Sequence, residues 1–157
     1  MRRGQELIGL PIVDLEDGEL IGKVVDILFS PEKKELLGVK AKNNKLWKGA
    51  RLIPQKSLYT LGKDIVVINN KRDLKQAEKS VASLNSGKEV MGKEVITEEG
   101  QVLGAVEDVI IDQDQKLLGY ELTDGLIQDI LTGRKLILFA EIELTYGEDI
   151  IIVTNGN

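Results

Sequence analysis

The chain has 157 residues, of which 42% are hydrophobic, 4% aromatic and 30% charged, and its formal net charge is −5. It contains no cysteine and no histidine, which excludes disulfides and every catalytic or metal site that depends on a thiolate or an imidazole. No stretch approaches the roughly 20 apolar residues of a membrane-spanning helix, and the N-terminal residues lack the apolar core of a signal peptide. We therefore expect a globular, cytoplasmic protein built from aliphatic β-structure.

The chain contains an internal duplication. Four segments recur in the same order: residues 4–9 (GQELIG) as 87–92 (GKEVMG), 20–26 (LIGKVVD) as 102–108 (VLGAVED), 36–38 (LLG) as 117–119 (LLG), and 62–68 (GKDIVVI) as 147–153 (GEDIIIV). A duplicated pattern marks repeated folding units, and a unit of about 65 residues has a marginal core on its own. We predict one unit in residues 1–70, a helical linker in residues 71–86 and a second unit in residues 87–157.

Each copy is predicted to form short strands separated by turns that contain Gly, Pro or Asp. The expected strands of the first copy are residues 6–14, 22–30, 36–42, 51–61 and 65–68. Those of the second copy are residues 93–97, 102–111, 117–123, 135–145 and 149–153. This number and spacing predicts a mostly β fold with two tandem small antiparallel β-barrels, since closing a sheet into a barrel removes its exposed edges.

The linker between the copies has a different composition. Leu74, Ala77, Val81 and Leu84 recur at helical spacing, and Asn70 can cap a helix that begins after it. We therefore predict a connecting helix of about three turns, which docks on a barrel through its narrow apolar stripe.

Charge is divided unequally between the copies. Residues 1–70 hold 12 Lys and Arg against 9 Asp and Glu, whereas residues 91–157 hold 4 against 14. Such asymmetry bears on partners rather than on the fold. One consequence to be tested is a homo-oligomer, in which the basic copy of one molecule meets the acidic copy of another.

Gly and Asp recur at matched positions in both copies. Duplicated acids can suggest paired carboxylates or two metal positions. Gly within a strand, however, is typical of a bulge or a close backbone approach, and Asp near a strand end is typical of a hydrogen-bond acceptor. We favour the structural interpretation and expect no catalytic residue, no metal and no cofactor. The residues of this repeat motif are Gly22, Asp26, Gly62, Asp64, Gly104, Asp108, Gly147 and Asp149.

The copies differ most between their third and fourth strands. The second copy has four apolar residues there, Leu126, Ile127, Ile130 and Leu131, where the first copy has Trp47. These four side chains form either a lid over the barrel end or an exposed patch that binds another protein. The lid is favoured because large exposed patches are uncommon in monomers. Trp47 is a further candidate for protein binding, since Trp is enriched at interface hot spots.

Basic residues gather near Trp47. Such a run could contact RNA phosphates or anionic lipid head groups, but it lacks the interleaved aromatic residues that stack on bases. We favour a solvated basic face and keep RNA binding as the alternative. The candidate anion-binding residues are Lys40, Lys42, Lys45, Lys48 and Arg51.

The repeated glycine-based pattern resembles the PRC-barrel family. It is carried in the first copy by Gly9, Ile12, Gly18, Ile21, Gly22, Val24, Asp26, Gly62, Asp64 and Val67, and in the second by Gly92, Val95, Gly100, Leu103, Gly104, Val106, Asp108, Gly147, Asp149 and Ile152. The resemblance covers both copies and implies small β-barrels that serve as protein-interaction modules. Members of this family include the cytoplasmic part of the photosynthetic reaction-centre H subunit and the C-terminal domain of a ribosome maturation factor. Neither of those roles is carried over, because this sequence shows neither the membrane helix of the first nor the additional N-terminal domain of the second.

The resemblance also implies a tandem, free-standing bacterial member, and it offers no catalytic motif to transfer. We therefore expect a non-enzymatic adaptor that binds another protein of unknown identity. Two alternatives stay open. One is an RNA- or ribosome-associated factor that uses the basic face of the first copy. The other is a barrel that binds a small molecule or a metal.

Overall fold

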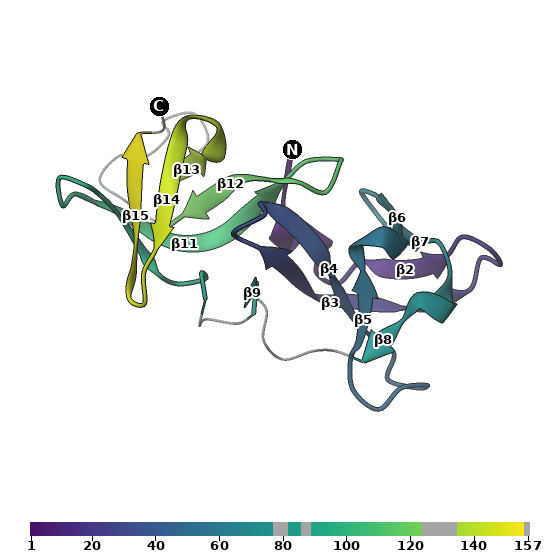
Figure 1. Ribbon diagram of the computed structural model, residues 1–157. Helices are drawn as coiled ribbons and strands as arrows, with labels where there is room; N and C mark the ends of the chain where they lie inside the picture. Colours follow the sequence, from purple (N-terminus) through teal and green to yellow (C-terminus); the bar gives the residue numbers. More distant parts are fainter. Residues whose placement is uncertain (77–81, 86–88, 124–134, 156–157) are drawn as a thin grey trace.

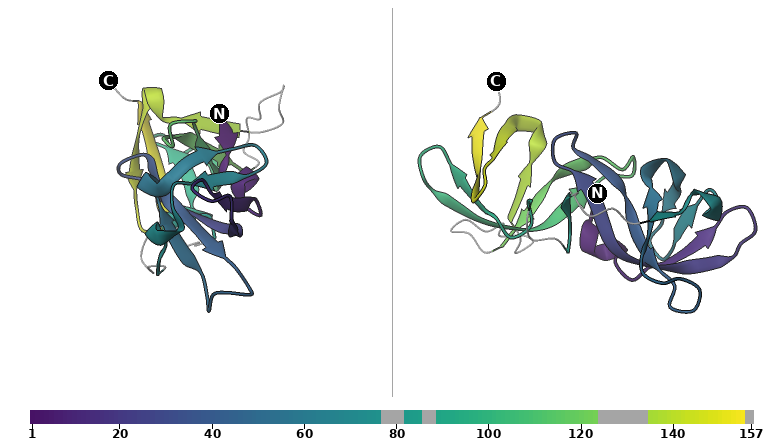
Figure 2. Two further views of the ribbon diagram at one scale, coloured as in Figure 1. Left: turned by 90° about the vertical axis from the view of Figure 1, so that its right-hand side faces the viewer. Right: turned by 60° about the horizontal axis from the view of Figure 1, so that its bottom comes forward.

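The computed structural model describes residues 1–76, 82–85, 89–123 and 135–155 (Figure 1). Two curved sheets, one from each repeat, lie side by side, and the N-terminal segment lies between them (Figures 1 and 2). No helix in these ranges is long and apolar enough to cross a membrane.

The first repeat forms an eight-stranded sheet in the order β6-β7-β2-β3-β4-β5-β8, with β9 paired to β3. Its neighbouring strands are antiparallel except for β2 and β7, which run parallel. The strands are β2 (Pro11–Asp14), β3 (Leu20–Ser30), β4 (Glu35–Lys42), β5 (Arg51–Pro54), β6 (Leu58–Leu61), β7 (Val66–Ile68), β8 (Lys75–Gln76) and β9 (Ala82–Ser83).

The second repeat forms a seven-stranded sheet in the order β13-β12-β11-β10-β15-β14, with β1 paired to β11. Here the parallel pair is β10 and β15, which matches β2 and β7 of the first repeat. The strands are β1 (Arg2–Arg3), β10 (Glu94–Thr97), β11 (Val102–Ile111), β12 (Leu117–Leu122), β13 (Lys135–Leu138), β14 (Ile142–Tyr146) and β15 (Ile150–Asn155).

The prediction of mostly β structure is confirmed, but that of closed antiparallel barrels is wrong. Over the described residues, the strand orders end at β6 and β8 in one sheet and at β13 and β14 in the other. The expected fourth strand of each copy is broken by a 3-10 turn, η2 (Gln55–Ser57) or η4 (Phe139–Glu141). Each break sends the two halves of that strand to different parts of the sheet. In the first copy the break follows Pro54, which cannot donate to a strand ladder.

The first expected strand is also shorter than predicted. Residues 6–14 divide into a 3-10 turn, η1 (Gly4–Leu7), and the short strand β2. The long strand expected at residues 102–111 is β11 itself. Long strands carry enough consecutive aliphatic residues to be found from the sequence, whereas short 3-10 turns leave the apolar pattern almost unchanged.

The predicted linker helix is not seen in the described residues. Asn70 does act as a cap, because its side-chain oxygen accepts a 2.8 Å hydrogen bond from the Arg72 N–H, but the capped element is the three-residue 3-10 turn η3 (Lys71–Asp73). The flanking residues pair instead as β8 on β5 and β9 on β3. Ala77 and Val81 of the predicted apolar stripe lie outside the described residues. Strand pairing with the first repeat therefore prevails over helical spacing on both sides of that gap.

Each repeat lends a short strand to the other. β1 begins the first repeat but pairs with β11 of the second, where Arg2 lies opposite Ile111. β9 precedes the second repeat but pairs with β3 of the first, where Ala82 lies opposite Phe29. Since Ile111 and Phe29 occupy matched positions of the duplication, the exchange is reciprocal.

The β3–β4 and β11–β12 turns also pair with each other. The N–H of Leu36 donates to the Gln115 carbonyl, and the N–H of Leu117 donates to the Lys34 carbonyl, both at 2.9 Å. Lys34 and Gln115 have positive φ angles of 54° and 65°, as tight turns require. These matched contacts give the junction between the repeats a two-fold character.

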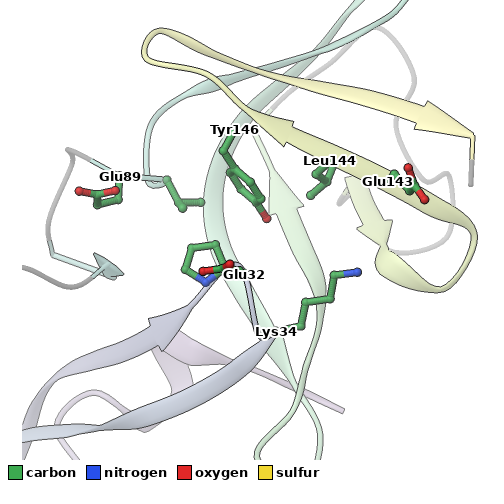
Figure 3. Close-up of a pocket in the computed structure, with 8 residues that line it drawn as sticks. Glu32, Lys34, Glu89, Glu143, Leu144 and Tyr146 are labelled. Atoms are coloured by element: carbon green, nitrogen blue, oxygen red, sulfur yellow. The ribbon is translucent and has the colours of Figure 1, made fainter.

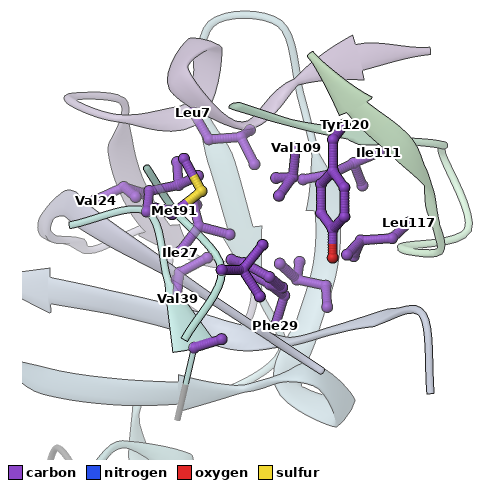
Figure 4. Packing of buried hydrophobic residues seen from close by; sticks show 14 of the residues in the cluster. Leu7, Val24, Ile27, Phe29, Val39, Met91, Val109, Ile111, Leu117 and Tyr120 are labelled. Atoms are coloured by element: carbon purple, nitrogen blue, oxygen red, sulfur yellow. The ribbon is translucent and has the colours of Figure 1, made fainter. Parts of the chain in front are cut away.

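One hydrophobic core runs through both repeats (Figure 4). Leu7 and Phe29 come from the first repeat, Val109, Ile111 and Tyr120 come from the second, and all five are fully buried. Burying one large apolar side chain stabilises a fold by about 1.5–3 kcal/mol. The shared core therefore supplies the stability that a unit of this size lacks alone.

A close backbone approach at Gly119 predicts a large effect of a single added methyl group. A Cβ at this position in β12 would lie 2.0 Å from the Ile137 carbonyl oxygen. We expect Gly119→Ala to lower the free energy of unfolding by about 3 kcal/mol, as measured by urea denaturation. The control is Gly9→Ala, where φ is +89° but nothing lies within 4 Å, and the expected loss is about 1 kcal/mol. Equal losses would contradict close packing as the reason for Gly119.

Candidate functional site

The recurring glycines lie at close backbone approaches and turns. A Cβ on Gly22 would lie 2.4 Å from the Lys42 carbonyl oxygen, and one on Gly104 would lie 2.6 Å from that of Thr123. Bulges interrupt the ladders next to these points, between Val24 and Asp26 and between Val106 and Asp108. Gly62 and Gly147 begin the matched turns before β7 and β15, whose Asp64 and Asp149 are exposed. The four glycines therefore serve the backbone path of the repeat.

Asp26 and Asp108 hold the exchanged segments in place. Each carboxylate accepts a 2.8 Å hydrogen bond from the N–H of the residue that follows it. Asp108 also accepts a 3.2 Å bond from the N–H of Gln5, and Asp26 accepts a 3.2 Å bond from the N–H of Asn85. Gln5 and Asn85 are each the second residue after a lent strand, so each repeated Asp binds the segment that follows the strand paired with its own repeat. The duplication identified these residues but not their role, because their partners lie 103 and 59 residues away in the chain.

A buried ionic cluster reinforces one of the two contacts. The Arg3 Nε lies 2.9 Å from Oε2 of Glu121 and 3.5 Å from Oδ2 of Asp108. The two carboxylates are 5% and 0% exposed, whereas the Arg3 side chain is 30% exposed. Burial raises the pKa of Asp108, and the N–H groups of Gln5 and Val109 and the Arg3 charge oppose that rise only in part. The cluster ties the N-terminal strand to the second repeat.

Asp112 and Asp114 of the β11–β12 turn stabilise the turn and do not form a cation site. The N–H of Asp114 donates to Oδ1 of Asp112 at 2.8 Å, which is an Asx-turn geometry. Within the described ranges, no group of three or more His, Cys, Asp or Glu side chains is arranged to hold a metal ion.

The basic residues predicted to share one face are divided between two places. Lys42 and Lys45 line a groove of about 470 Å³ together with Leu20 and Lys23, and we call these four residues the basic groove. Lys23 and Lys42 are directly opposite partners in the β3–β4 ladder. Sequence reasoning missed Lys23 because it precedes the basic run. Lys23 is exposed on β3, directly opposite Lys42 of the basic run. Pairing the two predicted strands in the sequence could have identified it.

The other predicted basic residues lie elsewhere. The Arg51 guanidinium lies 5.9 Å from the centre of the Trp47 ring, and both line a second hollow with Glu19 and Lys71. Lys40 is half-buried in the middle of β4, and Lys48 is exposed in the loop that follows.

Trp47 is half-buried and packs against the core. The four apolar residues of the corresponding loop in the second copy, Leu126, Ile127, Ile130 and Leu131, lie outside the described residues. The choice between a lid and a docking patch therefore stays a prediction.

A groove at the junction of the repeats was not predicted (Figure 3). It has a volume of about 740 Å³ and lies between the β3–β4 turn of the first repeat and β14 of the second. Its residues come from three separate segments of the chain that share no motif, so no local pattern marks it in the sequence. We call it the inter-repeat groove, and it is lined by Pro31, Glu32, Lys34, Glu89, Val90, Glu143, Leu144 and Tyr146.

The wall of the inter-repeat groove is fixed by a pair of tyrosines. The hydroxyl groups of Tyr146 and Tyr120 lie 2.8 Å apart in a hydrogen bond. Burial raises the pKa of Tyr146, so its hydroxyl is neutral near neutral pH. The Tyr120 ring in turn packs edge-on against Phe139, with 5.0 Å between the ring centres. The groove therefore has a rigid aromatic side.

Comparison with known proteins places both repeats in one family. The profile of the PRC-barrel domain matches residues 1–75 and 84–157, which is nearly the whole chain. A search of curated proteins finds no match.

The buried ionic cluster predicts a strong effect of removing Arg3. Arg3→Ala would leave the Asp108 and Glu121 carboxylates buried without this cation. We expect the free energy of unfolding to fall by about 2 kcal/mol, less than for a fully buried pair because Arg3 is 30% exposed. Urea denaturation measures the change. The control is Arg72→Ala, whose partner Glu16 is exposed, and the expected change is below about 0.5 kcal/mol.

The raised pKa of Asp108 predicts how its contribution to stability depends on pH. Because the pKa lies above its ordinary value of 3.8 in the folded protein, the folded state retains a proton that the unfolded state has released. The contribution of Asp108 is therefore largest below that value and falls as the pH rises through the raised pKa. We expect the stability of Asp108→Asn relative to the wild type to increase between about pH 4 and pH 7, measured by urea denaturation at each pH. A relative stability that stayed constant or decreased would contradict this assignment.

Proposed function

Since the chain belongs to the PRC-barrel family, we propose that it is a cytoplasmic, non-enzymatic module that binds another protein. The absence of His and Cys from the sequence removes the imidazole general base and the thiolate nucleophile, which supports a binding role. The glycines of the repeat motif, together with Asp26 and Asp108, have contacts that serve the fold. Binding is therefore expected on surfaces in which the two repeats differ.

The basic groove is the surface that carries the proposal. Lys23 and Lys42 lie directly opposite each other, an arrangement that destabilises a sheet because like charges repel. The fold itself does not require these lysines, because the second repeat has Ala105 at the position matching Lys23 and Thr123 at the position matching Lys42. A destabilising feature found in only one repeat is best explained by binding.

The chemistry of the basic groove favours an acidic segment of a partner protein. Three lysines converge on the groove, and Leu20 beside them is 62% exposed. Carboxylates of a partner would neutralise the lysines, while an apolar side chain would cover Leu20. The lysine stems add apolar contact area of their own.

RNA is the second candidate for the same surface, because converging lysines also neutralise phosphates. The nearby Trp47 offers little to a base, since it is half-buried and the Arg51 guanidinium lies over its ring. Single-stranded RNA binding generally relies on bases that stack on exposed aromatic side chains. The protein partner is therefore favoured.

Affinity capture from the native cell with matched baits tests the proposal. We expect the wild type and the control Lys56→Glu/Lys63→Glu to retain the same protein, and Lys42→Glu/Lys45→Glu to lose it at least about tenfold. Lys56 and Lys63 are exposed and lie outside the basic groove, so this control changes the charge by the same amount. Capture should survive nuclease treatment. The purified protein and its captured partner should bind each other more weakly as the salt concentration increases. If both variants retained the partner protein, binding at the basic groove would be contradicted. If capture were lost on nuclease treatment, RNA would be favoured as the ligand.

A further inference from the structure

The two sides of the junction are matched in backbone but not in side chains. On the side of β6, two side chains bridge the repeats. The Arg2 guanidinium donates to the carbonyls of Leu61 and Gly62 at 2.8 and 2.7 Å, and the Gln115 amide donates to the Leu58 carbonyl at 3.3 Å. A guanidinium carried by a short exchanged strand thus fastens the β6 edge of the first repeat to the junction.

On the opposite side, the inter-repeat groove occupies the matched place. Ala82 takes the position of Arg2 by its strand pairing, Lys34 takes that of Gln115, and Tyr146 takes that of Leu61. An alanine side chain cannot reach across to β14. Between described residues on this side, no hydrogen bond joins the β3–β4 turn to β14. The Gly147 carbonyl, which matches that of Gly62, accepts a 2.9 Å hydrogen bond from the Lys93 amine of its own repeat. The inter-repeat groove beside it stays open where Arg2 lies on the other side.

The charges around the inter-repeat groove favour a cation. Three glutamates, Glu32, Glu89 and Glu143, contribute to its lining against one lysine, Lys34. The Lys34 amine lies 5.4 Å from the centre of the Phe139 ring, so a cation–π contact engages it. At two of the three glutamate positions the matched residue on the Arg2 side is uncharged (Gln113 for Glu32 and Leu58 for Glu143).

The apolar part of the inter-repeat groove suits a long aliphatic stem. Val90 lines the groove and is almost fully buried. Leu144 and Tyr146 of β14 also line it, and Tyr146 points toward the turn at Glu32 (Figure 3). Arginine places its methylene groups on apolar surface while its charged end reaches polar groups. Its planar guanidinium, more weakly hydrated than an ammonium, also binds carboxylates and carbonyls with several donors at once.

We propose that the inter-repeat groove binds an arginine side chain on an extended segment of a partner protein, in the place that Arg2 occupies on the matched side, with the groove's glutamates as its acceptors. This inference rests on the proposed function, since it assumes a protein partner, but it concerns a different surface from the basic groove. It specifies the partner by chemistry: an arginine in an extended stretch, which meets acidic residues and the β14 edge.

Titration of the isotope-labelled full chain with synthetic peptides tests this inference directly. The probe is acetyl-Gly-Val-Arg-Val-Gly-amide, and the matched peptide carries citrulline, which keeps the shape of arginine without its charge. We expect saturable amide shifts at Val90, Leu144 and Tyr146 with the arginine peptide and at least about tenfold weaker binding of the citrulline peptide. Free L-arginine should bind more weakly than the peptide, because it lacks the backbone and flanking side chains.

Paired charge variants show whether the binding site is the inter-repeat groove. Glu32→Gln/Glu89→Gln should weaken the arginine peptide at least about threefold, whereas Glu98→Gln/Glu99→Gln, which removes two exposed carboxylates from the β10–β11 turn, should leave it unchanged. Equal weakening by both variants, equal affinity for the citrulline peptide, free arginine that binds as tightly as the peptide, or shifts confined to other residues would each overturn the inference.

Because this titration uses no cellular partner, its failure would leave the capture result at the basic groove intact. Failure of that capture would equally leave the titration interpretable.

Discussion

The structure depends on a reciprocal exchange between two copies of one sequence pattern. Asp108 binds the backbone of the segment that follows β1, and Asp26 binds the backbone of the segment that follows β9. β1, at the start of the first repeat, pairs with the long strand β11 of the second, and β9, just before the second repeat, pairs with the long strand β3 of the first. A buried carboxylate that accepts backbone N–H bonds is stable only while those donors are present. The two repeats are therefore bound to each other through the same residues that define them.

This constraint separates residues that serve the fold from those that are available for binding. The matched glycines, the two aspartates and the shared core have counterparts in both repeats and account for the junction. The lysines of the basic groove and the glutamates of the inter-repeat groove have largely lost such symmetry. One chain thus carries two chemically opposite surfaces on a nearly symmetric frame. A duplication makes this division simple, because one copy can change at a position where the other shows what the fold requires.

The sequence predicted the parts of the fold that depend on local pattern. The long strand at residues 102–111, the close approaches at Gly22 and Gly104, and the family follow from aliphatic runs and matched glycines. The prediction of a linker helix failed because strand pairing with the first repeat outweighs helical spacing. The prediction of closed barrels failed because 3-10 turns redirect the fourth strand of each copy. The Arg3 cluster and the inter-repeat groove could not be predicted. They join residues distant in the chain, and nothing in the local pattern of Arg3, Glu121 or Tyr146 marks these contacts.

The central claim is that the two repeats form one cooperative unit, and equilibrium unfolding followed separately in each repeat tests it most directly. Trp47, the single tryptophan, reports on the first repeat by fluorescence, and the amide signal of Val109 in β11 reports on the second by NMR. Reciprocal exchange predicts that both signals change in one coincident urea transition with the same midpoint and slope. Two separated transitions, with either repeat still folded after the other has unfolded, would contradict it.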